Sequence, residues 1–326
     1  MTGPRVSSLV LCLGAMTAGG CSSRDPAVTP ASAGCDDSGP VLALNRNSDE
    51  FVGLAEVIVA ARDGDVELVT GDWVATKPSF SPDGRSLVVV RAEGDYESAG
   101  PDSTSLWIID TDGPGQRALT DGPRDDDPAW SPDGEMIAFS QDTAGARGLE
   151  SQVVVIPAQG GDARTVLPNE GSVDVAPAWS PDGRELAFIR AEVQPDGRRA
   201  TTVWVVGADG THPREVAAVP DAYGVEWHPD GDALLVSTFT REDGTVLLVD
   251  LDTDNATRVA EHATFAAWSP DGDEIYYFVK EAAPQPSWWR LARGRLVGDR
   301  LERDGDVGEI EDYLYPYFGL AVSPCA

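Results

Sequence analysis

The chain contains few of the residues on which enzymes most often rely. Its 326 residues include three histidines, four cysteines and two lysines, Lys77 and Lys280. No G-x-S-x-G elbow, H-E-x-x-H zinc motif, P-loop or metal-type cysteine pair occurs in it. These absences exclude the usual signatures of serine hydrolases, zinc proteases and nucleotide-binding proteins, and they favour a binding protein over an enzyme.

The three histidines add little support for catalysis. His228 replaces the serine of a repeated turn motif, and His212 follows an Asp-Gly turn, where exposure is expected. His262 precedes a predicted strand, so it either faces a binding mouth or is an ordinary loop residue. We expect no catalytic residue among them.

Long helices are also missing from the pattern. No long stretch has an apolar period of 3.6 residues, whereas 34 glycines and 24 prolines separate short β-branched runs such as LVVVR, VVVIP and LLVST. The length allows two average domains or one large all-β domain. The runs predict an all-β fold of many short strands.

Positive charge is scarce. There are 24 lysines and arginines against 55 aspartates and glutamates, which gives a formal charge of −31. Such a surface repels nucleic-acid phosphates and anionic lipid, so we expect no nucleic-acid partner. Solubility, including solubility in a salty medium, explains the acidity, and binding of a cation or of a basic partner is the alternative.

The first 38 residues have the composition of a processing segment and a linker. Arg5 precedes an apolar run that is too short for a stable membrane span, so residues 1–20 are predicted to be a signal peptide. Small residues before Cys21 resemble a bacterial lipobox, although Ala18 stands where leucine is more usual. We expect lipidation at Cys21, a flexible tether over residues 21–38 and an extracytoplasmic domain anchored to the cell membrane, with simple secretion as the alternative.

An internal repeat is the strongest signal in the sequence. An aromatic residue followed by Ser-Pro-Asp-Gly, or by His-Pro-Asp-Gly in one copy, recurs five times, and a degenerate sixth copy reads Val-Ser-Pro-Cys-Ala. The second residue of the motif stands at positions 81, 131, 180, 228, 269 and 323, at separations of 50, 49, 48, 41 and 54. Each intact copy is followed by a strand, a variable loop, a second strand and a shorter segment. With the strand that leads into the aromatic residue, each unit has four strands, as propeller blades do.

Ser-Pro-Asp-Gly suits a type I turn, because proline fixes φ at the second position and aspartate bonds to local backbone N–H groups. We therefore assign the five repeated aspartates to turns rather than to catalysis. They are Asp83, Asp133, Asp182, Asp230 and Asp271.

The repeat resembles that of TolB-like β-propellers, and the same repeat occurs in the propeller domains of prolyl-oligopeptidase-type peptidases. The stretches ALTDGPRDDDPAWSPDGEMIAFS (residues 118–140) and VDVAPAWSPDGRELAFIR (residues 173–190) carry the resemblance, which extends over residues 39–326. The resemblance implies a β-propeller in the cell envelope with a protein or peptide partner.

The two ends of the chain are predicted to share one blade. Residues 41–46, 56–64 and 65–71 align with the second, third and fourth strands of a unit, and residues 317–322 align with an innermost strand. This arrangement gives a six-bladed propeller of four-stranded antiparallel blades, closed by the pairing of the N-terminal strands with the C-terminal one. Cys35 and Cys325 flank that pairing, so we expect a disulfide between them; identical peptide maps with and without reduction would disprove it.

Residues that enter the innermost strands converge at the mouth of the central channel. We expect a binding mouth from Lys77, Asp125, Asp126, Asp127, Asp174, Tyr223, His262, Tyr315 and Tyr317. Calcium could bind at Asp125, Asp126 and Asp174. The alternative is a solvated acidic loop in an acidic protein.

The sequence thus predicts a monomeric, membrane-tethered propeller that binds a protein or ligand without catalysis and without an obligatory cofactor. The membrane contact would come only from the lipid anchor. The alternatives are a calcium-dependent propeller hydrolase or lactonase and a sugar- or peptide-sensing domain, both using the acidic mouth.

Overall fold

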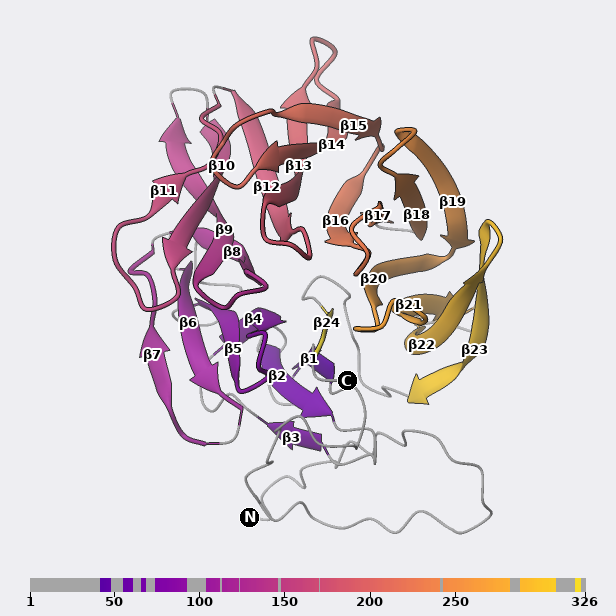
Figure 1. Ribbon diagram of the computed structural model, residues 1–326, viewed down its shortest axis with the longest axis horizontal. Helices are drawn as coiled ribbons and strands as arrows, with labels where there is room; N and C mark the ends of the chain where they lie inside the picture. Colours follow the sequence, from indigo (N-terminus) through magenta and orange to yellow (C-terminus); the bar gives the residue numbers. More distant parts are fainter. Residues whose placement is uncertain are drawn as a thin grey trace, which may run out of the picture.

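The computed structural model describes residues 42–47, 55–60, 66–68, 74–92, 104–308 and 320–323, with gaps at 112, 123, 146–147, 170, 241–242 and 282–287. These residues form strands and turns and contain no helix (Figure 1). Accordingly, no helix of the length and hydrophobicity of a membrane span is found in this part of the chain. The predicted all-β class is confirmed.

Four sheets have four antiparallel strands each. The first contains β4 (Val74–Phe80), β5 (Ser86–Ala92), β6 (Thr104–Asp110) and β7 (Gln116–Ala118). The second contains β16 (Ala222–Trp227), β17 (Ala233–Phe239), β18 (Gly244–Asp250) and β19 (Asn255–Glu261). The third contains β20 (Ala263–Trp268), β21 (Ile275–Glu281), β22 (Trp288–Val297) and β23 (Arg300–Gly308). The fourth contains β24 (Leu320–Val322), β1 (Leu42–Asn47), β2 (Ala55–Ala60) and β3 (Val66–Leu68).

A fifth sheet has eight strands because two antiparallel groups of four are joined. The first group is β8 (Asp125–Trp130), β9 (Met136–Gly145), β10 (Gly148–Pro157) and β11 (Arg164–Thr165). The second is β12 (Ser172–Trp179), β13 (Glu185–Val193), β14 (Arg199–Gly207) and β15 (Arg214–Ala218). A parallel contact between Ser151 of β10 and Val173 of β12 joins the two groups.

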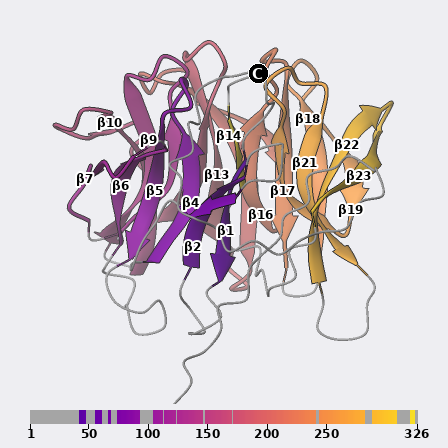
Figure 2. The ribbon, with the colours of Figure 1, turned by 90° about the horizontal axis from the view of Figure 1, so that it is seen from below.

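The first strand of each group lies near the centre of the molecule. These innermost strands are β4, β8, β12, β16, β20 and β24, and Figure 1 shows them around a common centre. Each contacts the next in this order, and β24 also contacts β4. Figure 2 shows the strands standing side by side when the molecule is turned on its edge. Residues that begin these strands are thereby brought together from distant parts of the sequence.

The N-terminal strand pairs with the C-terminal one. Leu42, Ala43 and Leu44 of β1 lie opposite Val322, Ala321 and Leu320 of β24 in an antiparallel register. The pairing expected between the two ends of the chain is therefore present. Cys21, Cys35 and Cys325 lie outside the described residues, so the lipidation and the disulfide stay predictions.

The hydrophobic core lies between neighbouring sheets. Ile189 and Val203 of one group pack with Trp227 and Leu234 of the next in a single buried cluster. The repeated tryptophans add a polar contact, because the indole N–H of Trp227 donates to the carbonyl oxygen of Ala178 at 3.1 Å. Trp179 makes the same contact with Ala129 at 3.2 Å. The aromatic residue of each repeat therefore packs against the preceding group.

The Ser-Pro-Asp-Gly turns are held by their own side chains. Asp83 Oδ1 accepts hydrogen bonds from Ser81 Oγ at 2.7 Å and from the backbone N–H of Arg85 at 3.1 Å. Gly84 has a φ of 69°, which favours glycine. The same serine–aspartate bond recurs at Asp133, Asp182 and Asp271, and at Asp230 the backbone N–H donates to His228 Nδ1. The hydrogen bond from the serine hydroxyl is the main cause that lowers the pKa of these carboxyls in Asp83, Asp133, Asp182 and Asp271.

Candidate functional site

Five of the innermost strands have a register shift of the β-bulge kind in their pairing with the next strand. In β4, for example, the register with β5 shifts between Thr76 and Ser79. The residue three positions before the repeat aromatic has a φ near +50° in four strands: Lys77, Asp127, Ala176 and Phe265. This left-handed conformation is uncommon for residues other than glycine and clusters at functional sites. The bulges place unusual residues at equivalent points of neighbouring strands.

Lys77 of β4 bridges two carboxylates of β8. Its Nζ atom lies 2.8 Å from Asp126 Oδ2 and 2.6 Å from Asp127 Oδ1. The exposed fractions of the three side chains are 19%, 45% and 19%. Asp126 is thus the member of this group that solvent, or a ligand, reaches most easily.

Asp127 extends the polar contacts to further strands. Its Oδ2 atom accepts a hydrogen bond from the backbone N–H of Ala176 in β12 at 3.3 Å and lies 3.5 Å from Ser140 Oγ in β9. Asp126 Oδ1 accepts from the backbone N–H of Asp127 at 2.9 Å. Side chains and backbone of β4, β8, β9 and β12 are therefore joined in one network.

The charges shift one another's ionisation. Burial acts to lower the pKa of Lys77, but Asp126, Asp127 and Tyr223 together raise it well above its usual value. Desolvation raises the pKa of Asp126; Lys77 opposes this effect and Asp127 adds to it. Lys77 therefore stays positively charged through the physiological range.

Aromatic rings lie beside this charged group. Lys77 Nζ is 5.9 Å from the ring centroid of Tyr223, within the range of a cation–π contact. The Tyr223 ring meets the Phe265 ring edge-on at 5.3 Å. Phe239 packs near both rings and near Trp289 at 6.0 Å. All four rings are partly buried and partly accessible.

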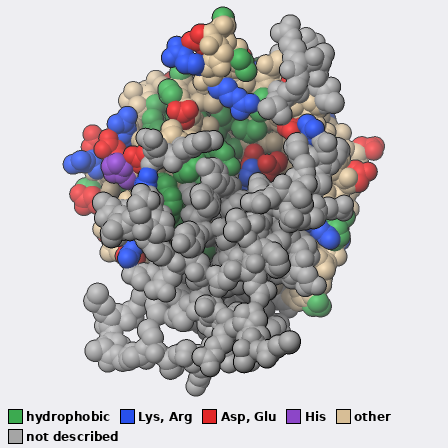
Figure 3. Space-filling model, turned by 180° about the vertical axis from the view of Figure 1, so that it is seen from behind, with side chains coloured by type: hydrophobic (Ala, Val, Ile, Leu, Met, Phe, Trp, Pro, Cys, Tyr) green, Lys and Arg blue, Asp and Glu red, His purple; other side chains and the backbone are tan. Residues whose placement is uncertain are grey.

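We name Lys77, Asp126, Asp127, Tyr223 and Phe265 the mouth cluster. Its members come from β4, β8, β16 and β20, so the fold assembles it from residues almost 190 positions apart. Four of the five belong to the mouth expected from the sequence. Figure 3 shows one face of the molecule, with hydrophobic side chains towards the middle of the described residues and charged ones both beside them and at the rim.

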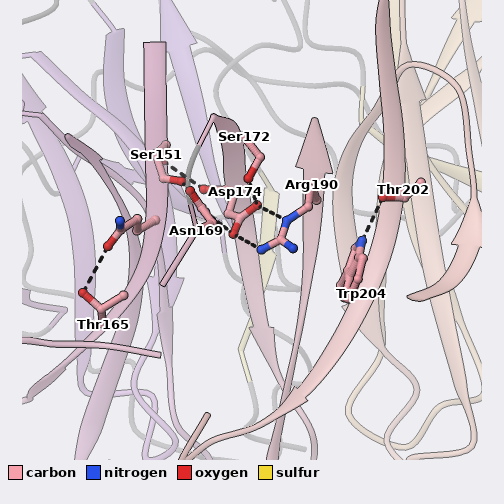
Figure 4. A network of polar contacts seen from close by, with 9 residues as sticks. Ser151, Thr165, Asn169, Ser172, Asp174, Arg190, Thr202 and Trp204 are labelled. Atoms are coloured by element: carbon pink, nitrogen blue, oxygen red, sulfur yellow. Dashed lines mark hydrogen bonds and ion pairs between the residues drawn. The ribbon is translucent and has the colours of Figure 1, made fainter. Parts of the chain in front are cut away.

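Asp174 is expected at the mouth but serves a different purpose. Its side chain is 1% exposed and its two oxygens each lie 2.7 Å from nitrogens of Arg190. The Asn169 side chain and the Ser172 hydroxyl donate to the same carboxylate, and Ser151 Oγ donates to the Asp174 carbonyl at 2.9 Å (Figure 4). The carboxylate is fully occupied within the protein.

Asp125 is also turned into the protein. It is fully buried, and its Oδ1 atom accepts a hydrogen bond from Gln141 Nε2 at 2.9 Å. Its Oδ2 atom makes no hydrogen bond of normal distance and angle. Burial raises the pKa of Asp125, although the side chains of Thr120 and Gln141 act in the opposite direction.

The remaining expected residues do not join the mouth cluster. His262 is 63% exposed and its Nδ1 atom lies 2.6 Å from Asp243 Oδ2. Tyr315 and Tyr317 lie outside the described residues. Asp125, Asp126 and Asp174 each have a separate partner, and in the described part of the chain no group of three histidine, cysteine or acidic side chains could hold a metal ion. The calcium site stays a hypothesis without geometric support.

The sequence did not predict that Phe265, Phe239 and Trp289 lie beside Tyr223. It also did not predict Arg190 as the partner of Asp174. Two signals were available. Phe265 stands three residues before the aromatic residue of its repeat, as Lys77 and Asp127 stand before theirs. Arg190 lies directly across the hairpin from Asp174 in the strand register.

The sheets and their shared centre define the chain as a β-propeller protein, in which neighbouring sheets pack face to face around a common axis. Residues 62–196 match the sequence model of the TolB beta propeller domain. Over this range the chain resembles TolB-like β-propellers.

Two curated proteins are similar to part of the chain. The "Uncharacterized peptidase YuxL" of Bacillus subtilis is 33% identical over 104 residues, 30% of this chain and 15% of that protein. The "Tol-Pal system protein TolB 1" of Novosphingobium aromaticivorans is 32% identical over 75 residues, 23% of this chain and 16% of that protein. The similarity therefore spans less than a fifth of either relative.

A solved structure is similar over most of the fold. The crystal structure of TolB from Acinetobacter baumannii superposes with a TM-score of 0.66 and 15% sequence identity, covering 88% of this chain and 67% of that one. At this identity the likeness concerns the fold alone.

Proposed function

We propose that this protein is a cell-envelope binding module that recognises a protein or peptide at the mouth cluster, without catalysis. The observation that carries the proposal is the convergence of Lys77, Asp126 and Asp127 with two aromatic rings at the register shifts of four innermost strands. Polar and aromatic groups at the centre of a rigid fold are the usual composition of a recognition site.

The charges of the mouth cluster indicate the chemistry of the partner. Two carboxylates face one ammonium group, so the cluster has one negative charge in excess, and Asp126 is 45% exposed. The whole chain carries a formal charge of −31. A partner segment with a lysine or arginine beside an apolar side chain would complement both the carboxylate and the rings of Tyr223 and Phe265.

We further propose the architecture and location in which this site works. The domain would be a closed six-bladed propeller over residues 39–326, monomeric, clasped by a Cys35–Cys325 disulfide and held at the membrane through lipidated Cys21 after removal of residues 1–20. The pairing of β1 with β24 supports the closure. A Cys21→Ser variant that stayed in the membrane fraction would contradict the anchor, whereas release of the wild type into the medium would favour secretion.

The enzymatic alternative, a calcium-dependent hydrolase or lactonase, needs a metal held by mouth carboxylates. Asp126 bonds to Lys77 and Asp174 bonds to Arg190, which weakens that alternative. A sugar- or peptide-sensing domain would use the same mouth cluster. Calcium titration by calorimetry and direct binding of oligosaccharides by the purified domain separate these alternatives from a protein partner.

The decisive experiment compares three baits made from the mature domain: wild type, Asp126→Lys, and Asp196→Lys as a matched control on an exposed hairpin. A partner crosslinked from the envelope fraction should be recovered at least tenfold less with Asp126→Lys and equally with Asp196→Lys. Equal urea midpoints would show that all three are folded. Equal recovery of every crosslinked protein by all three baits would refute a binding role for the mouth cluster.

A further inference from the structure

The mouth cluster already holds a cation, the ammonium group of Lys77. Its Nζ atom contacts one oxygen of Asp126 at 2.8 Å and one oxygen of Asp127 at 2.6 Å. The ring of Tyr223 lies 5.9 Å from the same atom. Two carboxylates and an aromatic face therefore surround a positive charge that the protein itself supplies.

The contact between Lys77 and Tyr223 spans the centre of the molecule. Each innermost strand contacts the next, and β16, which carries Tyr223, is the third strand from β4 in either direction. Lys77 of β4 thus reaches towards the strand on the opposite side. Its ammonium group lies where a side chain inserted by a partner would arrive.

The repeat does not require a lysine at this position. Three residues before the aromatic residue, the other intact copies have Asp127, Ala176, Gly224 and Phe265. Asp127, Ala176 and Phe265 have the same left-handed backbone as Lys77, with φ values of 49–51°. The local backbone therefore forms without a basic residue, and the charge of Lys77 needs another explanation.

A second site in the molecule shows how a guanidinium group uses the same kinds of partner. The Nε and Nη2 atoms of Arg190 donate to the two oxygens of Asp174 at 2.7 Å each (Figure 4). The ring of Trp204 lies 4.7 Å from the guanidinium carbon. Each oxygen receives its own N–H while the flat face of the group packs on a ring, and an ammonium group has neither the planar fork nor the flat face.

This difference decides which basic side chain can displace Lys77. A lysine of the partner would exchange one ammonium group for another and would gain no contact. An arginine would donate one N–H to Asp126 and another to Asp127, and its flat face would pack on the ring of Tyr223. A guanidinium group is also more weakly hydrated than an ammonium group, so less hydration is lost when it enters.

We propose that Lys77 is an internal competitor for the basic side chain of the partner, and that it makes the mouth cluster select arginine over lysine. This inference rests on the proposed binding function and adds the identity of the recognised side chain. When the partner binds, its arginine takes the place of the Lys77 ammonium between the two carboxylates, and Lys77 turns towards solvent.

Three short peptides test the selectivity. They have blocked ends and the sequence Gly-Gly-X-Phe-Gly, in which X is arginine, lysine or citrulline, the neutral isostere of arginine. In calorimetry with the wild-type protein, the arginine peptide should have a Kd about tenfold lower than the lysine peptide, and the citrulline peptide should not bind. The Lys77→Met variant should bind the lysine peptide about tenfold more tightly than the wild type does, so its preference for arginine should fall below about threefold.

Arg198→Met is the matched control. It also removes one positive charge, but from an exposed hairpin, and it leaves Lys77 in place. Its Kd values for the arginine and lysine peptides should stay within about twofold of those of the wild type. Equal urea midpoints would show that both variants are folded.

The wild-type protein offers a second measurement that does not depend on the stability of a variant. Because the chain has two lysines, labelling with ¹³C-lysine gives two Cε signals, and Lys77→Met assigns them. Addition of the arginine peptide should shift the Lys77 signal, whereas the citrulline peptide should not.

Three results would overturn the inference: a wild-type protein that binds none of the peptides or does not distinguish arginine from lysine, a lysine peptide that gains no affinity in Lys77→Met, or a Lys77 signal that stays in place at saturating arginine peptide. None of them decides the proposed binding function. That function fails only if the wild-type, Asp126→Lys and Asp196→Lys baits recover every crosslinked protein equally.

Discussion

Asp125 and Asp174 occupy the same place in two consecutive groups of strands, five residues before the repeat tryptophan, and both are fully buried. The residue opposite each in the adjacent strand differs: Gln141 faces Asp125 and Arg190 faces Asp174. Arg190 supplies two hydrogen bonds and a positive charge, whereas Gln141 supplies one neutral hydrogen bond. The two sites therefore separate the effect of the partner from the effect of the position.

The comparison shows that an acidic residue near a channel entrance need not be a binding group. Asp174 forms a buried ion pair with Arg190. The Arg190 guanidinium also packs on the ring of Trp204, at 4.7 Å from the ring centroid. Asp125 lacks a cation, and its pKa is raised by burial. Of these four aspartates, only Asp126 and Asp127, at the register shift of β8, belong to the mouth cluster.

Removal of Arg190 should have the largest effect. Arg190→Met leaves the Asp174 carboxylate buried without a charged partner, which costs about 3–5 kcal/mol in other buried pairs. Gln141→Met removes one neutral hydrogen bond and should cost about 1 kcal/mol. The free energy of unfolding from urea titration at pH 7 measures both.

The double variant Arg190→Met/Asp174→Asn is the control for this prediction. It removes the uncompensated charge, so it should recover a large part of the stability lost in Arg190→Met. If the double variant were as unstable as the single one, lost packing on Trp204, rather than the charge, would account for the effect.

Asp125→Asn should have an intermediate effect, opposite in sign at neutral pH. A carboxyl with a raised folded-state pKa contributes its full stability below the ordinary value of about 3.9, and this contribution is lost as the pH rises through the folded-state pKa. At pH 7 the variant should therefore be more stable than the wild type by about 1 kcal/mol, and at pH 3 the two should converge. Urea midpoints at both pH values test this, and a variant that is less stable at pH 7 would contradict it.

These sites also show how far the sequence can be interpreted. The repeat predicts the strands and the turn aspartates because they depend on local spacing. It predicts the β1–β24 pairing because the strand that the first unit of the repeat lacks matches the strand at the other end of the pattern. The side-chain directions of Asp125, Asp126 and Asp127 do not follow from spacing, because the bulge at Asp127 breaks the two-residue alternation of the strand. The Tyr223–Lys77 contact joins strands almost 150 residues apart, so only the assembled fold reveals it.

The smallest effect is expected from Gln141→Arg, which gives Asp125 the partner that Asp174 has. The added guanidinium should stabilise the ionised carboxylate, lower its pKa and raise the free energy of unfolding at pH 7 by about 0.5–1 kcal/mol. The gain should stay below the contribution of Arg190, because the guanidinium of Arg190 also packs on Trp204, which lies opposite Phe188. The equivalent position of β10, opposite Phe139, is Val154. Gln141→Lys supplies a point charge without the paired donors of arginine, so it should gain less. If Gln141→Arg were no more stable than the wild type at pH 7 and still lost stability between pH 4 and 7, the fully buried position of Asp125, rather than its missing cation, would set its ionisation.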